Sequence, residues 1–322
     1  MAVGVILAGD IGGTKTNLAL FNGGDPGDPV ALVTYASREH GDLETMVRAF
    51  LVEHPVELQA ACFGVAGPVH HRSVDATNLA WPVDAESLAR LLELPHVGLL
   101  NDVEANAWGI AALGADDIAV LNEGDPAARG NAAVIAAGTG LGQAGLYWDG
   151  KRHHPFATEG GHVDFAPRNE LEVELYRFLA SELGHVSYER VCSGMGIDNL
   201  YRFFLHLGSQ PAPDWYLGAQ DKAAAIAIAA DAGDETAGRA LELFCSTYGA
   251  QAGNLALIMM ALGGVYLGGG IAPKLLPWLR RGSFIDAFVG KGRFESLLRS
   301  IPVKVILNDR TALLGAALFA MA

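Results

Sequence analysis

The chain has 322 residues, 40 of them glycine, and its 36 acidic against 22 basic side chains give a net charge of −14. This length corresponds to one large or two ordinary domains. Glycine exceeds the average of about 7%, but charged residues make up only 18% and glycine shows no three-residue period, which excludes disordered and collagen-like chains. The acidic balance, with no basic run, predicts no nucleic acid partner.

Three cysteines, Cys62, Cys192 and Cys245, are widely spaced and lack CxxC or Cys/His ligand spacing. They indicate reduced thiols and no zinc. The first ten residues lack a basic segment before an apolar one, which favours a cytoplasmic protein. The uncharged stretch 243–273 resembles a membrane span in composition. Its glycines instead predict a buried helix, a buried strand and a Gly-rich loop, and no membrane partner.

The first hundred residues change from a meander to alternating strands and helices. We predict an antiparallel meander of strands over 3–8, 16–21 and 30–35, with a turn at 9–14. A helix over 43–54, a strand over 60–65, a helix over 85–92 and a strand over 97–100 follow, and this alternation calls for parallel pairing. A helix then runs from Asn101 to Gly114, and residues 115–117 form a domain boundary.

The second part repeats the opening theme about 130 residues later. A strand over 132–137, a Gly-rich turn at 138–140 and a strand over 143–148 predict a second half built like the first. The rest is mainly helical. Helices are predicted near 171–183, 194–207, 222–230, 236–261 and 311–320, with strands over 265–267 and 303–307.

Residues 9–16 (GDIGGTKT) nearly match a P-loop. Thr14 stands where that motif needs glycine before Lys15, and a strand rather than a helix follows, so a Walker-type site is rejected. The remaining interpretation is a carboxylate, Asp10, at a strand end beside a turn whose N–H groups can approach phosphate. A plain hairpin with glycines for positive φ stays an alternative.

Two further Gly-rich segments have a similar character. Residues 138–142 (GTGLG) overlap a match to GxGxxG over residues 140–145. No helix begins at these glycines, so a dinucleotide-binding site is rejected, and a second phosphate-binding turn is predicted instead. Residues 267–273 (LGGGIAP) form a predicted loop in which an adenine ring can lie against bare backbone.

Several acids occupy positions where sites form. Asp102 follows an apolar strand, where ligands collect in α/β sheets, and can accept a proton from a substrate hydroxyl. Asn101 to Glu104 fits a helix capping box equally well, and both interpretations stay open on local sequence. Glu159 and His162 flank two glycines in a predicted loop and can point at one ligand. Local sequence does not distinguish Glu189 from a surface acid.

Taken in order, the motifs resemble the bacterial glucokinase family, within the superfamily of sugar kinases, actin and heat-shock chaperones. The resemblance covers the whole chain. It rests on these segments: 9–14 (GDIGGT), 63–68 (FGVAGP), 77–82 (TNLAWP), 100–102 (LND), 137–142 (AGTGLG), 159–162 (EGGH), 189–194 (ERVCSG) and 268–271 (GGGI).

The resemblance implies a two-domain, actin-like (ribonuclease H-like) α/β ATPase fold with an interdomain cleft. A small α/β domain would comprise 1–113 plus 309–322, and a large α+β domain 114–308. Asp102 would be the general base on the sugar 6-hydroxyl, and the other hydroxyls would be held by Asn101, Glu159, His162 and Glu189. ATP would be bound by Gly9, Asp10, Ile11, Gly12, Gly13, Thr14, Gly138, Thr139, Gly140, Gly269 and Gly270, with Asp10 holding Mg²⁺ through water.

The expected function is ATP-dependent phosphorylation of D-glucose to glucose 6-phosphate by a cytoplasmic homodimer. Another hexose or an N-acetylhexosamine as substrate stays open, as do ADP or polyphosphate as donor and the role of Lys15. A non-catalytic sugar sensor is a remote alternative, since no DNA-binding segment is found. The Cys-rich zinc motif of the related repressor and kinase family is absent after His162, where VDFAPR follows, so no zinc is expected. Met195 also departs from the family's usual proline.

Overall fold

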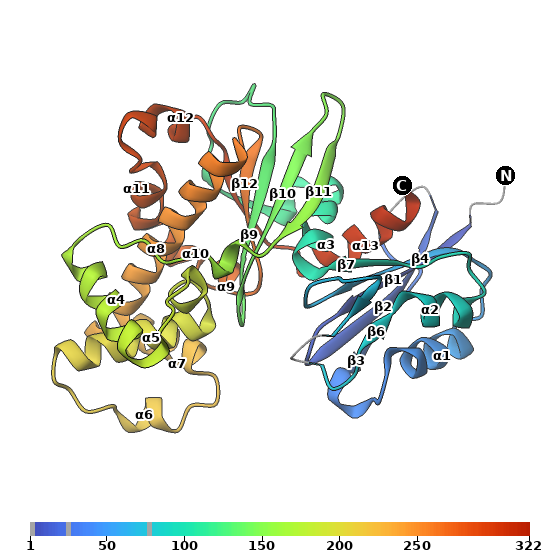
Figure 1. Cartoon of the computed structure of the whole chain (residues 1–322), viewed down its shortest axis with the longest axis horizontal. Coiled ribbons are helices and arrows are strands. Elements are labelled where there is room, and N and C mark those ends of the chain that lie inside the picture. The colour runs from blue at the N-terminus through green and yellow to red at the C-terminus, as the bar shows by residue number, and fades with distance from the viewer. Residues whose placement is uncertain (1–3, 24–26, 76–78) are drawn as a thin grey trace. The chain divides into compact units, whose positions relative to one another are not determined.

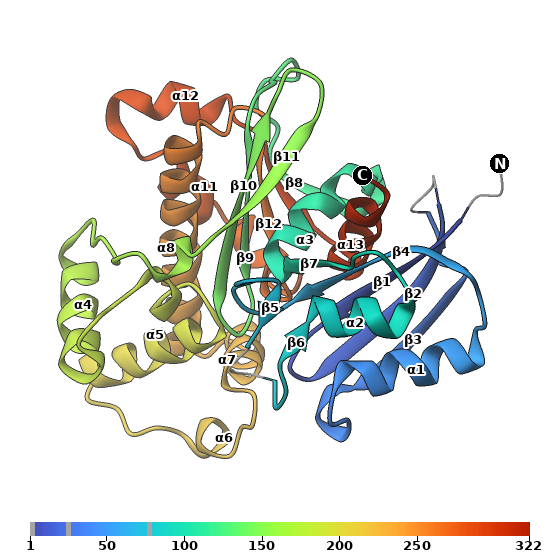
Figure 2. The ribbon, with the colours of Figure 1, turned by 45° about the vertical axis from the view of Figure 1, so that its right-hand side comes forward.

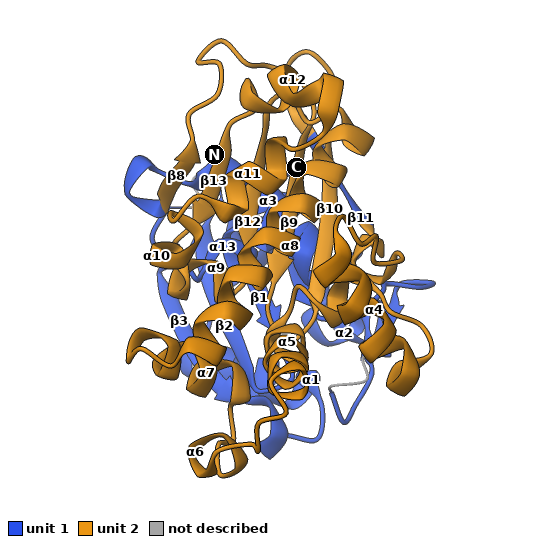
Figure 3. Ribbon diagram, turned by 90° about the vertical axis from the view of Figure 1, so that its left-hand side faces the viewer, with its two compact units in different colours: residues 1–117, 154–157, 308–322 blue, residues 118–153, 158–307 orange. Residues whose placement is uncertain are grey.

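The computed structural model describes residues 4–23, 27–75 and 79–322. The chain forms two compact units: unit 1 contains residues 1–117, 154–157 and 308–322, and unit 2 contains residues 118–153 and 158–307 (Figure 3). The predicted domain limits, 1–113 with 309–322 against 114–308, stay a prediction. Part of the motif 77–82 lies outside the described residues.

Unit 1 is built on a five-stranded sheet in the order β3-β2-β1-β4-β7. The first three strands pair antiparallel, which confirms the predicted meander. β4 pairs parallel with both β1 and β7, as the alternating pattern predicted. The strands are β1 (Val5–Ile11), β2 (Lys15–Asn22), β3 (Ala31–Ala36), β4 (Leu58–Val65) and β7 (Gly98–Asn101), with a separate pair β5 (Ser73–Val74) and β6 (Val83–Asp84).

Helices cover both faces of this sheet (Figure 1). α1 (Leu43–Glu53) and α2 (Ala85–Leu92) pack on one face, in a core that contains Leu7, Leu18 and Phe63. α3 (Asp102–Gly109) and α13 (Thr311–Met321) pack on the other, around Ile6 and Phe21. The side chains alternate between the two cores because successive residues of a strand point to opposite faces. Short 3-10 turns complete the unit: η1 (Ser37–Glu39), η2 (Ile110–Ala112) and η3 (Ala115–Asp117).

Unit 2 repeats this sheet. Its strand order is β11-β10-β9-β12-β13-β8, in which β9 and β10 form an antiparallel hairpin while β9, β12 and β13 are parallel neighbours. The first five strands follow the order of β3-β2-β1-β4-β7, which confirms the prediction of two similarly built halves. The strands are β8 (Ile118–Asn122), β9 (Ala132–Ala137), β10 (Leu141–Trp148), β11 (His153–Thr158), β12 (Gly264–Gly268) and β13 (Val303–Ile306).

The helical layer of unit 2 centres on α8 (Glu235–Met259), which runs alongside the sheet (Figure 2). Tyr248 of α8 donates a hydrogen bond to the carbonyl oxygen of Ile135 in β9 at 2.8 Å. The uncharged stretch 243–273 is thus a buried helix and strand, as predicted, and within the described residues no helix is long and apolar enough to span a membrane. The other helices are α4 (Glu170–Leu183), α5 (Gly194–Leu207), α6 (Asp214–Leu217), α7 (Lys222–Asp231), α9 (Ile271–Lys274), α10 (Leu276–Leu279), α11 (Ser283–Val289) and α12 (Glu295–Arg299), with turns η4 (Gly160–His162), η5 (Tyr188–Arg190) and η6 (Gly292–Phe294).

Three predicted segments are corrected. The turn placed at 9–14 begins only after Ile11: Gly9 belongs to β1, where it packs against the ring of Phe63 with no room for a side chain. The predicted loop 267–273 contains the end of β12 and the start of α9. The helix predicted to reach Gly114 ends at Gly109, whose α-carbon packs against the backbone of Thr311. The strands β8 and β11 and the short helices α6 and α10 to α12 were not predicted.

Candidate active site

Unit 1 gathers polar side chains at the carboxyl ends of its parallel strands. Val65 of β4 pairs with Ile11 of β1 on one side and with Asn101 of β7 on the other. Asp10 and Asn101 therefore lie at one edge of the sheet, two strand spacings or roughly 10 Å apart. This edge is where α/β sheets bind ligands.

Asn101 is the N-cap of α3. Its Oδ1 accepts hydrogen bonds from the backbone N–H of Val103 at 2.9 Å and of Glu104 at 3.4 Å, while its Nδ2 donates to the carbonyl of Gly67 at 3.0 Å. The predicted cap is confirmed. The cap places Asp102 on the first turn of the helix, where the helix dipole favours a carboxylate, and the Oδ1 of Asp102 accepts from the N–H of Val103 at 3.0 Å.

Asp10 lies near the end of β1. Burial raises the pKa of Asp10, a 3.4 Å hydrogen bond from Asn17 Nδ2 opposes this shift, and the negative charge of Asp309 adds to it. A carboxyl group with a raised pKa beside a second acid is stabilised by a bound cation, so these residues fit Mg²⁺. Within the described ranges no group of three or more His, Cys, Asp or Glu side chains could hold a metal ion.

The turn from Gly12 to Thr14 is held by Ser37, which sequence reasoning missed. The hydroxyl of Ser37 donates to the carbonyl of Gly12 at 2.6 Å, and its N–H donates to the carbonyl of Thr14 at 3.0 Å. The N–H of Gly12 closes the hairpin on the carbonyl of Lys15 at 2.9 Å. The carbonyl oxygens of Gly12 and Thr14 both point to Ser37, so their partial negative charge is not directed at an anion bound at the turn. None of the predicted glycines here has a positive φ.

Unit 2 brings together three predicted sugar-binding residues. The imidazole of His162 lies 4.0 Å from a carboxylate oxygen of Glu159 on one side and 4.0 Å from Oε1 of Glu189 on the other. The side chains of His162 and Glu159 are 60% and 65% exposed, but that of Glu189 is 17% exposed. Glu189 is therefore fixed in place, and its Oε2 accepts a hydrogen bond from the N–H of Leu141 at 3.0 Å.

The glycine pair between Glu159 and His162 allows this grouping. A Cβ on Gly161 would clash with the carbonyl oxygen of Leu141, and one on Gly160 would clash with the side-chain amide of Gln143. The 3-10 turn η4 thus lies directly on β10, where only glycine fits. Gly140 is constrained in the same way, since its Cβ would clash with the carboxylate of Glu189.

The second predicted phosphate-binding turn, at residues 138–140, lies beside a cavity of about 690 Å³. The N–H of Gly138 bonds to the carbonyl of Gly140 at 2.9 Å, and the N–H of Gly194 bonds to the carbonyl of Gly138 at 2.8 Å. These bonds join the 138–140 turn to the start of α5. Three residues predicted to bind ATP, Gly138, Thr139 and Gly270, line the cavity. Gly269 is adjacent, with φ +78° and its α-carbon packed on Ala137.

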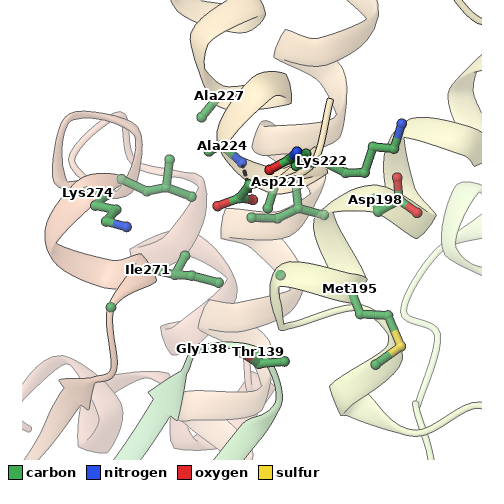
Figure 4. A pocket seen from close by; sticks show the side chains of 16 residues that line it. Gly138, Thr139, Met195, Asp198, Asp221, Lys222, Ala224, Ala227, Ile271 and Lys274 are labelled. Atoms are coloured by element: carbon green, nitrogen blue, oxygen red, sulfur yellow. Dashed lines mark hydrogen bonds between the residues drawn. The ribbon is translucent and has the colours of Figure 1, made fainter. Parts of the chain in front are cut away.

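Other residues that line the cavity were not predicted (Figure 4). Asp221 caps α7 through a 3.0 Å bond to the N–H of Ala224, and Lys222 lies over the ring of Tyr216 at 4.3 Å. Tyr216 donates to Asp198 at 2.6 Å. The only sequence signal for this part of the cavity was the pair Asp221-Lys222 before an alanine-rich helix, and such a pair is typical of an ordinary helix N-cap. The unpredicted lining side chains drawn with labels are Met195, Asp198, Asp221, Lys222, Ala224, Ala227, Ile271 and Lys274.

These features define a kinase of the actin-like ATPase fold, with Gly-rich turns at strand ends beside clustered acids. The glucokinase family model matches residues 7–322. The chain is 43% identical to the glucokinase of Synechocystis sp. over 350 residues, with 99% of each chain covered. The solved glucokinase of an Antarctic psychrotroph has a TM-score of 0.87 at 32% identity and 98% coverage of both chains. The protein belongs to the glucokinase family, which consists of hexokinase-type phosphotransferases.

The fold extends to more distant sugar kinases. A ROK family glucokinase from Streptomyces griseus, solved with glucose and AMPPNP, covers 98% of this chain and 99% of its own, with a TM-score of 0.67 at 21% identity. At that identity the match shows the fold alone.

Proposed function

We propose that this protein transfers the γ-phosphoryl group of ATP to the 6-hydroxyl of D-glucose. One observation carries the proposal: Leu141 directly follows the Gly138–Gly140 turn, and its N–H binds Glu189 at 3.0 Å. A phosphate-binding turn and a sugar-binding carboxylate are thus held against each other by one residue. Membership of the glucokinase family supports the same pair of substrates.

We assign the sugar hydroxyls to Asn101, Glu159, His162 and Glu189. Carboxylates accept two hydrogen bonds at once and so read the stereochemistry of neighbouring hydroxyls. A sugar with one hydroxyl inverted would leave one of these polar groups without a hydrogen-bond partner. The unpaired group lowers the binding free energy by more than the loss of an apolar contact would.

Asp102 acts as general base in this proposal. The proton of the 6-hydroxyl passes to Asp102, the 6-oxygen forms a bond to the γ-phosphorus, and the bond from that phosphorus to the bridging oxygen breaks to release ADP. General-base catalysis of this kind contributes roughly 10²–10⁴ in rate, and positioning with charge stabilisation supplies most of the remainder.

The nucleotide contacts come from backbone rather than from side chains. Gly9 to Thr14 and Gly138 to Gly140 would lie against the phosphates, with the N–H groups of Gly12 and Gly138 bonded within their own turns. Gly269, Gly270 and the cavity of about 690 Å³ would accept the adenosine. Asp10 would hold Mg²⁺ through water, and the metal would neutralise charge on the phosphates.

The test is ADP release by the purified protein with ATP, Mg²⁺ and a panel of glucose, mannose, fructose, N-acetylglucosamine and N-acetylmannosamine. We expect kcat/KM to be highest for glucose by at least about tenfold, because the acids discriminate epimers. A higher value for another sugar would assign the site to that sugar, and no turnover with any of them would overturn the kinase proposal. The same sugars are also tested with ADP or polyphosphate in place of ATP, and the compound that supports turnover is the phosphoryl donor.

We also propose a cytoplasmic homodimer. All three cysteines are buried and none forms a disulfide, which supports a reducing compartment. Light scattering should give twice the mass of one chain; a single-chain mass at micromolar concentration would contradict the dimer.

A further inference from the structure

Lys291 places a cation against two neutral acceptors in the helical layer of unit 2. Lys291 follows α11 in the chain. Its ammonium group donates hydrogen bonds to the carbonyl of Ala250 at 2.9 Å and to Oδ1 of Asn254 at 2.6 Å, and both acceptors belong to α8. Among the described residues it makes no ion pair within 4.0 Å. A half-buried cation whose hydrogen-bond acceptors are both neutral is costly, so its retention calls for an explanation.

The packing of α8 is arranged to admit this side chain. A Cβ on Gly253 would come within 2.9 Å of Cε of Lys291, and a Cβ on Gly249 would clash with the carbonyl oxygen of Phe284 in α11. The two glycines, one turn apart, let α11 pack closely on α8. The close packing brings Lys291 to Asn254.

The hydrogen bonds continue from Asn254 to the sugar-binding segments. Nδ2 of Asn254 donates to the hydroxyl of Tyr188 at 3.1 Å and to Oε1 of Gln251, one turn earlier on α8, at 3.0 Å. Tyr188 immediately precedes Glu189, and its backbone N–H donates to the carbonyl of Val163, the residue after His162, at 3.0 Å. Tyr188 thus connects the segment that carries Glu189 with the segment that carries His162.

The ammonium group determines the direction of this chain. A lysine cation can only donate, so the amide of Asn254 must turn its oxygen to Lys291 and its nitrogen to Tyr188. Without the cation, the amide can reverse, and the hydroxyl of Tyr188 then loses the hydrogen bond from Asn254 and keeps only the one from the backbone of Ala166.

We infer that Lys291, acting through Asn254 and Tyr188, is a positioning residue that fixes Glu189 and His162 for sugar binding. The inference rests on the proposed function. Lys291 contacts neither substrate in this scheme. Its loss should act mainly on glucose binding, because the 138–140 turn is also held by its own backbone bond and by the bond from Gly194.

The experiment compares Lys291→Met and Tyr188→Phe with the control Lys151→Met, an exposed lysine in the turn between β10 and β11. KM for glucose, KM for ATP and kcat are measured for each. We expect the first two variants to raise KM for glucose roughly tenfold, the size of one lost charge-assisted hydrogen bond, with KM for ATP and kcat within about twofold of the wild type. The control should match the wild type.

The pH dependence of glucose affinity gives a second test, because a purely structural role of Lys291 in packing would not change with pH in this way. Burial, together with the charge of Arg168, lowers the pKa of Lys291 to about 8, and the charge of Glu172 of α4 partly opposes this shift. Arg168 and Glu172 are paired with each other at 2.5 Å, and Tyr188 of η5 faces Lys291 through Asn254. A neutral amine accepts as well as donates and no longer orients the amide. Calorimetric glucose affinity of the wild type should therefore fall above pH 8, and that of Lys291→Met should not change there.

The outcomes separate this inference from the proposed function. A wild-type protein that does not phosphorylate glucose overturns the function itself. An active wild type whose Lys291→Met and Tyr188→Phe variants keep KM for glucose within about twofold overturns the positioning role, and so does an equal rise in both KM values with a lower melting temperature. If Lys291→Met does not fold, Tyr188→Phe decides, because it retains the ring that packs on Phe165.

Discussion

At the scale of single residues, Asp102 is the group that we propose as general base. Its position on the first turn of α3 is set by the Asn101 cap, whose bonds do not require a charge on Asp102. We expect Asp102→Asn to fold normally, to bind glucose within a few-fold of the wild type, and to lose roughly 10²–10⁴ in kcat.

Steady-state kinetics with calorimetric glucose binding checks this prediction. The matched control is Asp116→Asn, an exposed acid of the same unit, which should keep wild-type kcat. Near-normal turnover of Asp102→Asn would remove Asp102 as the base.

Glu104 gives a second residue-scale prediction, on stability. Burial raises the pKa of Glu104, and a hydrogen bond from the backbone of Asn101 partly opposes this. The folded state therefore binds the proton more tightly than the unfolded state. This group's contribution to the unfolding free energy falls as pH rises from the ordinary glutamate pKa of 4.5 through the raised pKa of the folded state. Glu104→Gln keeps the capping box and should be more stable than the wild type at pH 7.

The Glu104→Gln advantage should disappear in urea denaturation below pH 4.5, where the carboxyl is neutral in both states. The control is Glu86→Gln, an exposed acid in the first turn of α2 that loses the same dipole interaction without the burial. A Glu104→Gln variant less stable than Glu86→Gln at pH 7 would contradict the burial argument.

At the scale of elements, the η4 turn depends on close contact with β10. Gly161→Ala would force a methyl group against the carbonyl of Leu141. We expect a loss of about 1–3 kcal/mol in unfolding free energy together with a higher KM for glucose, because Glu159 and His162 move with the turn.

Gly41→Ala is the control, since no atom lies within 4 Å of its added Cβ. Chemical denaturation should place that variant within about 0.5 kcal/mol of the wild type. Equal stability of Gly161→Ala and Gly41→Ala would contradict the close contact.

Much of the fold could be predicted at this scale. The two hairpins and α2 follow from apolar periodicity and turn residues, and α2 was predicted with its exact bounds, 85–92. The edge strand β8 was missed because its half-buried side chains do not alternate. Gly9 was taken for a turn because sequence alone does not reveal that a neighbouring ring, Phe63, occupies the place of its side chain.

The candidate site was predicted where chemistry leaves a local pattern. Closely spaced glycines marked 138–140, and a glycine pair between an acid and a histidine marked 159–162. Ser37, Asp198 and Lys222 were missed because they reach their partners through the tertiary fold and stand in sequence as ordinary turn and helix residues. Glu189 was singled out only by the family resemblance, since its contact with Leu141 spans 48 residues.

At the scale of the whole molecule, glucose should stabilise the fold by mass action. A ligand at 100 times its Kd adds about 2.7 kcal/mol to the unfolding free energy. We expect the melting temperature to rise with glucose in both the wild type and Asp102→Asn, since the variant keeps the sugar site. Sorbitol at the same concentration is the control, and a shift of equal size with sorbitol would contradict a specific sugar site.

The most direct test of the central claim is the identity of the product. The wild-type protein is incubated with ¹³C-labelled glucose, ATP and Mg²⁺ and followed by carbon and phosphorus nuclear magnetic resonance. The account predicts one phosphate ester, on carbon 6, formed in equal amount to ADP. Phosphorylation at another carbon, or ADP formed with free phosphate and unchanged glucose, would contradict it.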